Sequence, residues 1–223
     1  MTIITLIAVG IASIFMLGAI VSSFWAYTIL RDKIFLAFSI LFLFSLLTEW
    51  TGFGYSYFTR KSNHFIFNIS MWVDLLFYNY WFLTTEKNKS LHKIVILIAS
   101  LSIIFALING IFIQGFFTYN TYTYYAESFV IILFCIFHFY SIIKEETIVY
   151  PLRNYIFLIN TGLFFYFVGT ITYFLLWDYM VTKQVDVNGK IILYIQFILD
   201  IVEYIFFIIA FLMAIKWKKT KLY

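Results

Sequence analysis

The chain has 223 residues, of which 64% are hydrophobic, 24% aromatic and only 12% charged. Soluble globular domains have about 45–50% apolar and about 25% charged residues, so this composition excludes a soluble domain and predicts a membrane protein. The formal net charge of +4 comes from basic residues in short segments between apolar runs. Such a distribution indicates membrane orientation and excludes a basic nucleic-acid-binding face.

Apolar stretches long enough to cross a bilayer recur through the whole chain. A transmembrane helix needs about 20 mostly apolar residues. Runs such as IFLAFSILFLFSLL lack the apolar–polar alternation of a β-barrel strand. We therefore predict an all-α polytopic membrane protein, a single domain of residues 1–223 with seven uninterrupted transmembrane helices. In chain order the predicted spans are Ile3–Tyr27, Ile34–Tyr55, Phe65–Thr85, Ile94–Phe116, Tyr125–Ile143, Ile156–Trp177 and Ile191–Ile215.

The loops between these spans differ in basic residues, and this difference predicts the orientation. One set of alternating segments carries Arg31, Lys33, Lys87, Lys89, Lys93, Lys144, Arg153, Lys216, Lys218, Lys219 and Lys221. The other set carries Arg60, Lys61, Lys183 and Lys190. The positive-inside rule then places the N-terminus outside and the C-terminus inside, in the inner membrane of a bacterium.

Acidic residues interrupt the second, third and fifth predicted spans. Glu49 lies toward the outer end of the second, Asp74 near the middle of the third, and Glu127 at the outer end of the fifth. An ionisable group at membrane depth costs about 2.5–3.5 kcal/mol on insertion scales, and it usually faces a bundle interior or a water-filled cavity. His138, near the inner end of the fifth span, is the only candidate cation at membrane depth.

The seventh span carries a polar stripe of its own in the segment YIQFILDIVEY. Gln196, Asp200 and Glu203 are spaced i, i+4, i+7 and therefore share one helix face. Because the acids of several spans cannot all be dry and ionised, we expect them to line an outward-facing acidic cavity between the second, third, fifth and seventh helices. Its expected ligand is small and cationic or polar.

Two structural interpretations of the same residues stay open. Glu49 and Glu127 can be interfacial acids whose side chains reach toward the headgroups. Asp200 and Glu203 can instead hydrogen-bond to neighbouring helices, through residues such as Asn160 or Asn109, because polar groups often hold membrane helices together.

The sequence carries no recognisable catalytic, metal or cofactor motif. His64, His92 and His138 are divided between the two faces of the membrane, which does not make a zinc site. The last span lacks the lysine that a retinal protein needs. An intramembrane lipid-modifying enzyme in which Asp74 and Asp200 share a proton, and a small proton- or cation-coupled transporter or channel, are alternatives to a binding protein.

Several stretches resemble the small seven-helix membrane proteins and sensor modules of Bacteroidetes, which occur alone or fused to histidine kinases. They are LLTEWTGFGY, NHFIFNISMWVDLLFYNYWF, ALINGIFIQGFFTYNTYTYYAES and PLRNYIFLINTGLFFYFVGTITYFLL. The resemblance implies a non-enzymatic sensor whose acids Glu49 and Asp74 match those of the family pattern. Because this chain stops at KWKKTKLY, we expect the output to pass to a separate membrane-bound kinase or other membrane protein.

Overall fold

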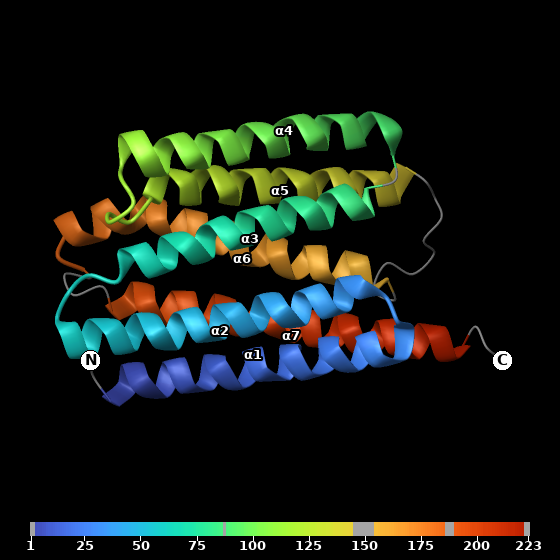
Figure 1. The fold of residues 1–223 in the computed structure, drawn as a ribbon, viewed down its shortest axis with the longest axis horizontal. Helices are drawn as coiled ribbons and strands as arrows, with labels where there is room; N and C mark the ends of the chain where they lie inside the picture. Colours follow the sequence, from blue (N-terminus) through green and yellow to red (C-terminus); the bar gives the residue numbers. More distant parts are fainter. Residues whose placement is uncertain (1–2, 87, 145–153, 186–189, 221–223) are drawn as a thin grey trace. The chain divides into compact units, whose positions relative to one another are not determined.

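The computed structural model describes residues 3–86, 88–144, 154–185 and 190–220, and this part of the chain consists of helices joined by short connections, without a strand (Figure 1). The prediction of an all-α protein is confirmed there. The elements are α1 (Ile3–Leu30), α2 (Lys33–Thr59), α3 (His64–Thr85), α4 (Lys89–Ile108), the π-helical segment η1 (Asn109–Ile113), α5 (Thr121–Lys144), α6 (Tyr155–Thr182) and α7 (Lys190–Thr220). Lys87, Arg153 and Lys221 of the loop-charge argument lie outside the described residues.

Six of the seven long helices are long and apolar enough to cross a membrane: α1, α2, α4 with η1, α5, α6 and α7. Helix α3 is not in this group, because Asn68, Asp74 and Asn79 lower its hydropathy. The six helices support a multi-pass membrane protein. A seventh span and the orientation stay predictions.

The helices form two compact units. Unit 1 consists of Met1–Ser39 and Ile148–Tyr223, and unit 2 of Ile40–Thr147. In unit 1, α1 and α6 both pack on α7. In unit 2, α3, α4 and α5 pack on one another (Figure 1).

Aromatic rings from α2 and α7 fill the core of unit 1. The Phe38 ring centroid lies 5.7 Å from that of Phe207 and 5.4 Å from that of Phe211. A polar contact accompanies them, since the hydroxyls of Ser23 and Ser39 share a 2.7 Å hydrogen bond between α1 and the first turns of α2. Both serines are buried, and each hydroxyl also lies within hydrogen-bond distance of a backbone carbonyl of its own helix, so both have partners inside the protein.

Small residues let α6 approach α7 closely. A Cβ added to Gly162 would lie 2.8 Å from the Cβ of Phe206, and one added to Gly169 would lie 2.6 Å from the Cδ2 of Leu199. The first obstacle is fixed to the backbone, whereas the second is the end of a flexible side chain. Close approach at small residues is a common way for membrane helices to associate.

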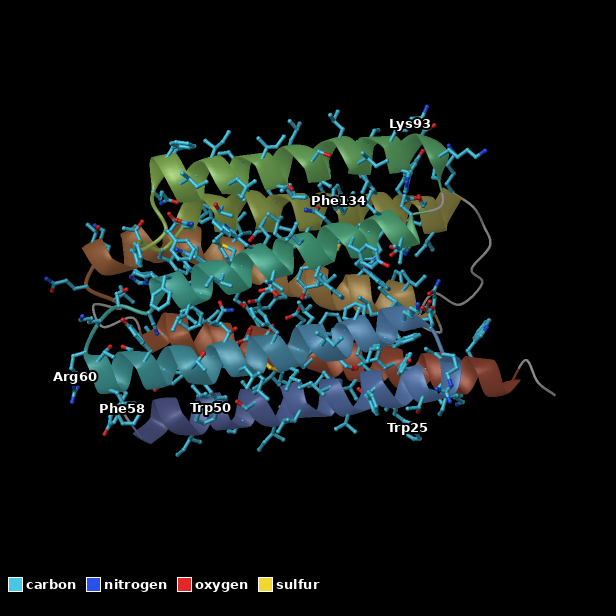
Figure 2. The ribbon with its side chains drawn as sticks, viewed as in Figure 1. Trp25, Trp50, Phe58, Arg60, Lys93 and Phe134 are labelled. Carbon is cyan, nitrogen blue, oxygen red and sulfur yellow. The ribbon has the colours of Figure 1, made fainter. Side chains whose placement is uncertain are left out.

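Unit 2 has an apolar centre with polar contacts between its helices. The ring centroids of Phe82 on α3 and Phe134 on α5 are 5.3 Å apart. Phe134 is labelled in Figure 2. The Asn79 side chain donates to the hydroxyl of Ser102 on α4 at 3.3 Å. These contacts hold α3 against both α4 and α5.

The buried carboxylate of Glu86 closes unit 2 where α3 ends. It accepts hydrogen bonds from the backbone N–H of Asn88 at 2.7 Å and from the hydroxyl of Ser141 on α5 at 3.1 Å. The sequence argument did not single out this acid.

Large apolar side chains point outward from the helices. Trp25, Trp50 and Phe58 are 51%, 48% and 83% exposed (Figure 2). This is typical of helices whose surroundings are lipid. Arg60 and Lys93, which belong to oppositely assigned loops, lie at opposite ends of the unit 2 helices in Figure 2.

The end of the fourth helix differs from the uninterrupted span predicted for Ile94–Phe116. Helix α4 passes into the π-helical η1, in which the N–H of Gln114 donates to the carbonyl of Asn109 at 2.9 Å. Gly115 then adopts a positive φ of 80°, a conformation that glycine tolerates readily and that ends the helix. Single π-helical turns occur frequently at functional sites.

Candidate functional site

One end of unit 2, where α3, η1 and the start of α5 meet, carries several interhelical polar contacts. Asn68 of α3 is fully buried and makes three of them. Its Nδ2 donates to the carbonyls of Phe116 at 2.8 Å and Thr118 at 2.7 Å, and its Oδ1 accepts from the N–H of Asn120 at 3.1 Å. A single side chain therefore fixes the connection between η1 and α5 to α3.

A second network joins η1 to the first turn of α5. The Nδ2 of Asn109 donates to the Oε1 of Gln114 at 2.9 Å and to the hydroxyl of Thr123 at 2.8 Å. The Nε2 of Gln114 donates to the hydroxyl of Thr121 at 2.8 Å. Because these partners come from both sides of the connection, the π-helical turn and the start of α5 are held together.

Several polar atoms inside this end of unit 2 are buried and have no hydrogen-bond partner. They are Trp72 Nε1, Asn109 Oδ1, Asn120 Nδ2, Asn120 Oδ1 and Glu127 Oε1. Natural proteins leave few such atoms, and each costs about 1–3 kcal/mol when it stays unsatisfied. A concentration of them is typical of a place where water, an ion or a ligand belongs.

Gly110 brings two of these groups together. A Cβ at this position would lie 2.5 Å from Cζ2 of Trp72 and 3.3 Å from Nδ2 of Asn120. The indole of α3 and the amide that precedes α5 thus both lie against the same turn of η1. A larger residue at position 110 would displace them.

Two of the predicted acids occur at the same place. Glu127 of α5 is only 2% exposed, and its carboxyl interacts electrostatically with Asp74 of α3. Asp74 is partly buried and accepts a long hydrogen bond, 3.4 Å, from the hydroxyl of Ser70. The charge of Glu127 also affects Tyr119 in the connection between η1 and α5. Burial raises the pKa of the Tyr119 hydroxyl, and the negative charge of Glu127 raises this pKa further.

Along α5, the polar residues follow one face. Asn120, Thr123 and Glu127 are separated by three and four residues, which places them above one another on a helix. The side chains of a helix tilt toward its N-terminus, so Glu127 leans toward Asn120. The arrangement can offer a small polar molecule hydrogen-bond donors and acceptors at one level and a carboxyl group deeper in.

The predicted residues of α7 lie in unit 1 and have local partners. Gln196 donates through Nε2 to the hydroxyl of Tyr166 on α6 at 2.7 Å and to the Oδ1 of Asp200 at 3.2 Å. Glu203 is 5% exposed, and its backbone carbonyl lies 3.5 Å from the Cβ position of Gly162. The shared helix face is confirmed for Gln196 and Asp200, and Tyr166 is a partner that the sequence argument did not name.

The six predicted site residues thus fall into local groups. Glu49, Asp74 and Glu127 belong to unit 2, and Gln196, Asp200 and Glu203 belong to unit 1, where Gln196 donates to Asp200. A common cavity for all of them stays a prediction.

Four residues that organise the unit 2 site were not predicted from the sequence: Asn68, Trp72, Gly110 and Asn120. Asn109 was predicted only as a hydrogen-bonding neighbour of Asp200 and Glu203, whereas its side chain donates to Gln114 and Thr123. The available signal was the concentration of amides in NGIFIQGFFTYN, a segment that follows a strongly apolar helix.

Among the described residues, no group of three or more His, Cys, Asp or Glu side chains is arranged to hold a metal ion. Comparison with protein-family models, curated proteins and solved structures finds no match for the chain. The candidate site therefore has to be interpreted from its own chemistry.

Proposed function

We propose that this protein is a non-enzymatic, multi-pass protein of a bacterial inner membrane that binds a small polar or cationic ligand at the η1 end of unit 2. In this proposal it acts as a sensor or as a partner subunit of a membrane signalling complex. The observation that supports it best is the set of buried polar atoms without partners around Asn120 and Glu127. A ligand that forms hydrogen bonds with these atoms would favour the conformation in which they lie close together. The difference between its affinities for the two conformations would determine how far the equilibrium shifts.

Ligand binding is tested on the purified protein. Native protein extracted in mild detergent is denatured, and the released small molecules are identified by mass spectrometry. We expect one compound to be enriched with the wild type and depleted at least severalfold with Glu127→Gln and Asn120→Ala. Glu86→Gln is the matched control, because the Glu86 carboxylate already has partners in Asn88 and Ser141. Equal recovery from all variants would contradict binding at this site.

The signalling role is tested by co-purification. A membrane-bound histidine kinase or another membrane protein should be recovered with the wild type from native membranes at a constant ratio. Recovery of the protein alone, under conditions that preserve other membrane complexes, would contradict a partner-subunit role.

The site should open to the outside in the proposed orientation. Ser62 and Ser90 are exposed and lie in the connections before α3 and at the start of α4. A membrane-impermeant thiol reagent should label Ser62→Cys in intact cells. It should label Ser90→Cys only after the cells have been permeabilised. The reverse pattern would invert the topology and place the site at the cytoplasmic face.

Proton- or cation-coupled transport is a second candidate, favoured by the π-helical end of the fourth span and by the buried acid Glu127 in the same unit. Transporters often place irregular helix segments beside their substrate and ion sites. Liposomes that contain the protein should then show a proton or cation flux, and Asp74→Asn should abolish it. Asp200→Asn tests whether unit 1 also contributes to the flux. Absence of flux under any cation or proton gradient would remove this candidate.

A further inference from the structure

The orientation of the amides decides which atoms the site offers to a ligand. The backbone N–H of Tyr122 donates to the Oε1 of Gln114 at 3.0 Å, which identifies that atom as the oxygen. The Asn109 atom that bonds to it must then be the donor Nδ2, and the Oδ1 of Asn109 remains as a buried acceptor. The chain itself therefore determines that Asn109 presents an oxygen.

The atoms without partners divide into two chemical kinds. Trp72 Nε1 can only donate a hydrogen bond, and Asn120 Nδ2 also donates. Asn109 Oδ1, Asn120 Oδ1 and a carboxylate oxygen of Glu127 accept. A molecule that carries only donors would leave the two donor atoms unsatisfied, and one that carries only acceptors would leave the three acceptor atoms unsatisfied.

Charge narrows the ligand further. Glu127 is buried, and Asp74 is the charged group with which it interacts. No ion pair with Lys, Arg or His satisfies either acid among the residues that the structure describes. Buried carboxylates normally have a cationic partner, so a ligand ammonium group would supply the missing charge. A simple anion, in contrast, would be repelled.

We infer that the ligand is a small zwitterion of the amino-acid class, an inference that rests on the proposed ligand-binding function of this site. Its carboxylate accepts hydrogen bonds from Trp72 Nε1 and Asn120 Nδ2. Its ammonium donates to Asn109 Oδ1 and to the Glu127 carboxylate. Both ends of the ligand are held by charge-assisted hydrogen bonds, which are the stronger kind.

Spacing along α5 agrees with a ligand of this size. Asn120 and Glu127 are seven residues apart, which corresponds to about 10 Å along a helix axis. The tilt of the Glu127 side chain toward the N-terminus of α5 shortens the remaining distance. The length of the ligand is therefore a variable of the test, which uses amino acids of three lengths.

The test uses the full-length protein in mild detergent. It compares the binding of zwitterions with the binding of molecules that carry only the amine or only the carboxylate. Glycine, β-alanine and γ-aminobutyrate are titrated by calorimetry against ethylamine, butylamine and butyrate. We expect at least one amino acid to bind about tenfold or more tightly than the matched amine and carboxylate, the difference that one hydrogen bond to a charged group supplies. Equal binding of amine and amino acid would overturn the inference.

Two substitutions separate the two ends of the site. Trp72→Phe keeps an aromatic ring but removes the Nε1 donor, so it should reduce the preference for the amino acid over the amine to less than about threefold. Glu127→Gln should weaken the binding of the amine and of the amino acid alike. Glu86→Gln should leave the titrations unchanged. If Trp72→Phe is unstable, Asn120→Ala removes the second donor at the same end, and an unchanged preference in it would contradict the inference.

The inference and the proposed function fail in different ways. If no zwitterion of the panel binds while native protein releases another compound that Glu127→Gln depletes, the zwitterion class is wrong and the binding function stands. If native protein releases no compound and the panel does not bind, both are wrong.

Discussion

Replacement of Asn68 by alanine should destabilise unit 2 more than any other single amide substitution at the site. The side chain is fully buried, and its three hydrogen bonds serve the carbonyls of Phe116 and Thr118 and the N–H of Asn120. At a net value of about 1 kcal/mol for each hydrogen bond, their loss should lower the free energy of unfolding by about 3 kcal/mol. The N–H of Asn120 would then stay buried without this acceptor.

The only cysteine of the chain provides the assay. Cys135 lies in α5 within unit 2 and is fully buried, so a thiol-specific dye reacts with it only when the unit opens. A loss of about 3 kcal/mol should make labelling under native conditions more than a hundredfold faster, since each 1.4 kcal/mol changes the open population by about tenfold.

A matched control tests whether the number of hydrogen bonds matters. The Asn63 side chain makes one interhelical bond, to the carbonyl of Gly52 at 3.0 Å. Its replacement by alanine should speed the labelling of Cys135 by less than about tenfold. If Asn68→Ala labels within about threefold of the wild type, the side chain does not hold the connection and the account of the site is wrong.

Three further substitutions test other contacts. Gly162→Ala should lower the midpoint of thermal aggregation more than Gly169→Ala, by the equivalent of about 1–3 kcal/mol, because its new methyl group meets a backbone-fixed atom; equal midpoints would contradict the close contact. Glu86→Ala should speed dye labelling about tenfold or more, since the buried donors it serves lose their acceptor; an unchanged rate would show that this carboxylate is dispensable. In a double-mutant cycle, Ser23→Ala and Ser39→Ala should couple by about 0.6 kcal/mol, as hydrogen bonds between membrane helices do on average; additive effects would mean that the pair contributes nothing.

The helices could be predicted closely because apolar length dominates in membranes. The predicted third span Phe65–Thr85 differs by one residue from α3, which is His64–Thr85. The seventh helix begins at Lys190, one residue before its predicted start, and continues to Thr220, five residues past its predicted end. Hydropathy marks where a helix leaves the hydrocarbon, whereas backbone hydrogen bonds can continue beyond that point. The π-helical turn of the fourth helix could not be predicted, because side-chain contacts to α5 support it.

The site could be predicted only in part, because it too depends on side-chain contacts between segments that are distant in the sequence. Asp74 and Glu127 stand out in apolar surroundings, so the sequence alone identifies them, whereas a meeting of acids from different helices stays a prediction. The positions of Trp72 and Asn120 depend on how a connection folds back onto α3. That path is determined by the three hydrogen bonds of Asn68 and by the absence of a side chain at Gly110, neither of which has a periodic signature in the sequence.

A π-helical turn is an α-helix that contains one extra residue. Deletion of one residue within Ile111–Ile113 would let α4 continue as a regular helix and would rotate Gln114 by about 100° relative to α5. The apolar content of the span would hardly change, so the shortened chain would still enter the membrane. Among homologous sequences, a one-residue gap at this place would therefore separate chains that keep the binding chemistry from chains that retain only the scaffold.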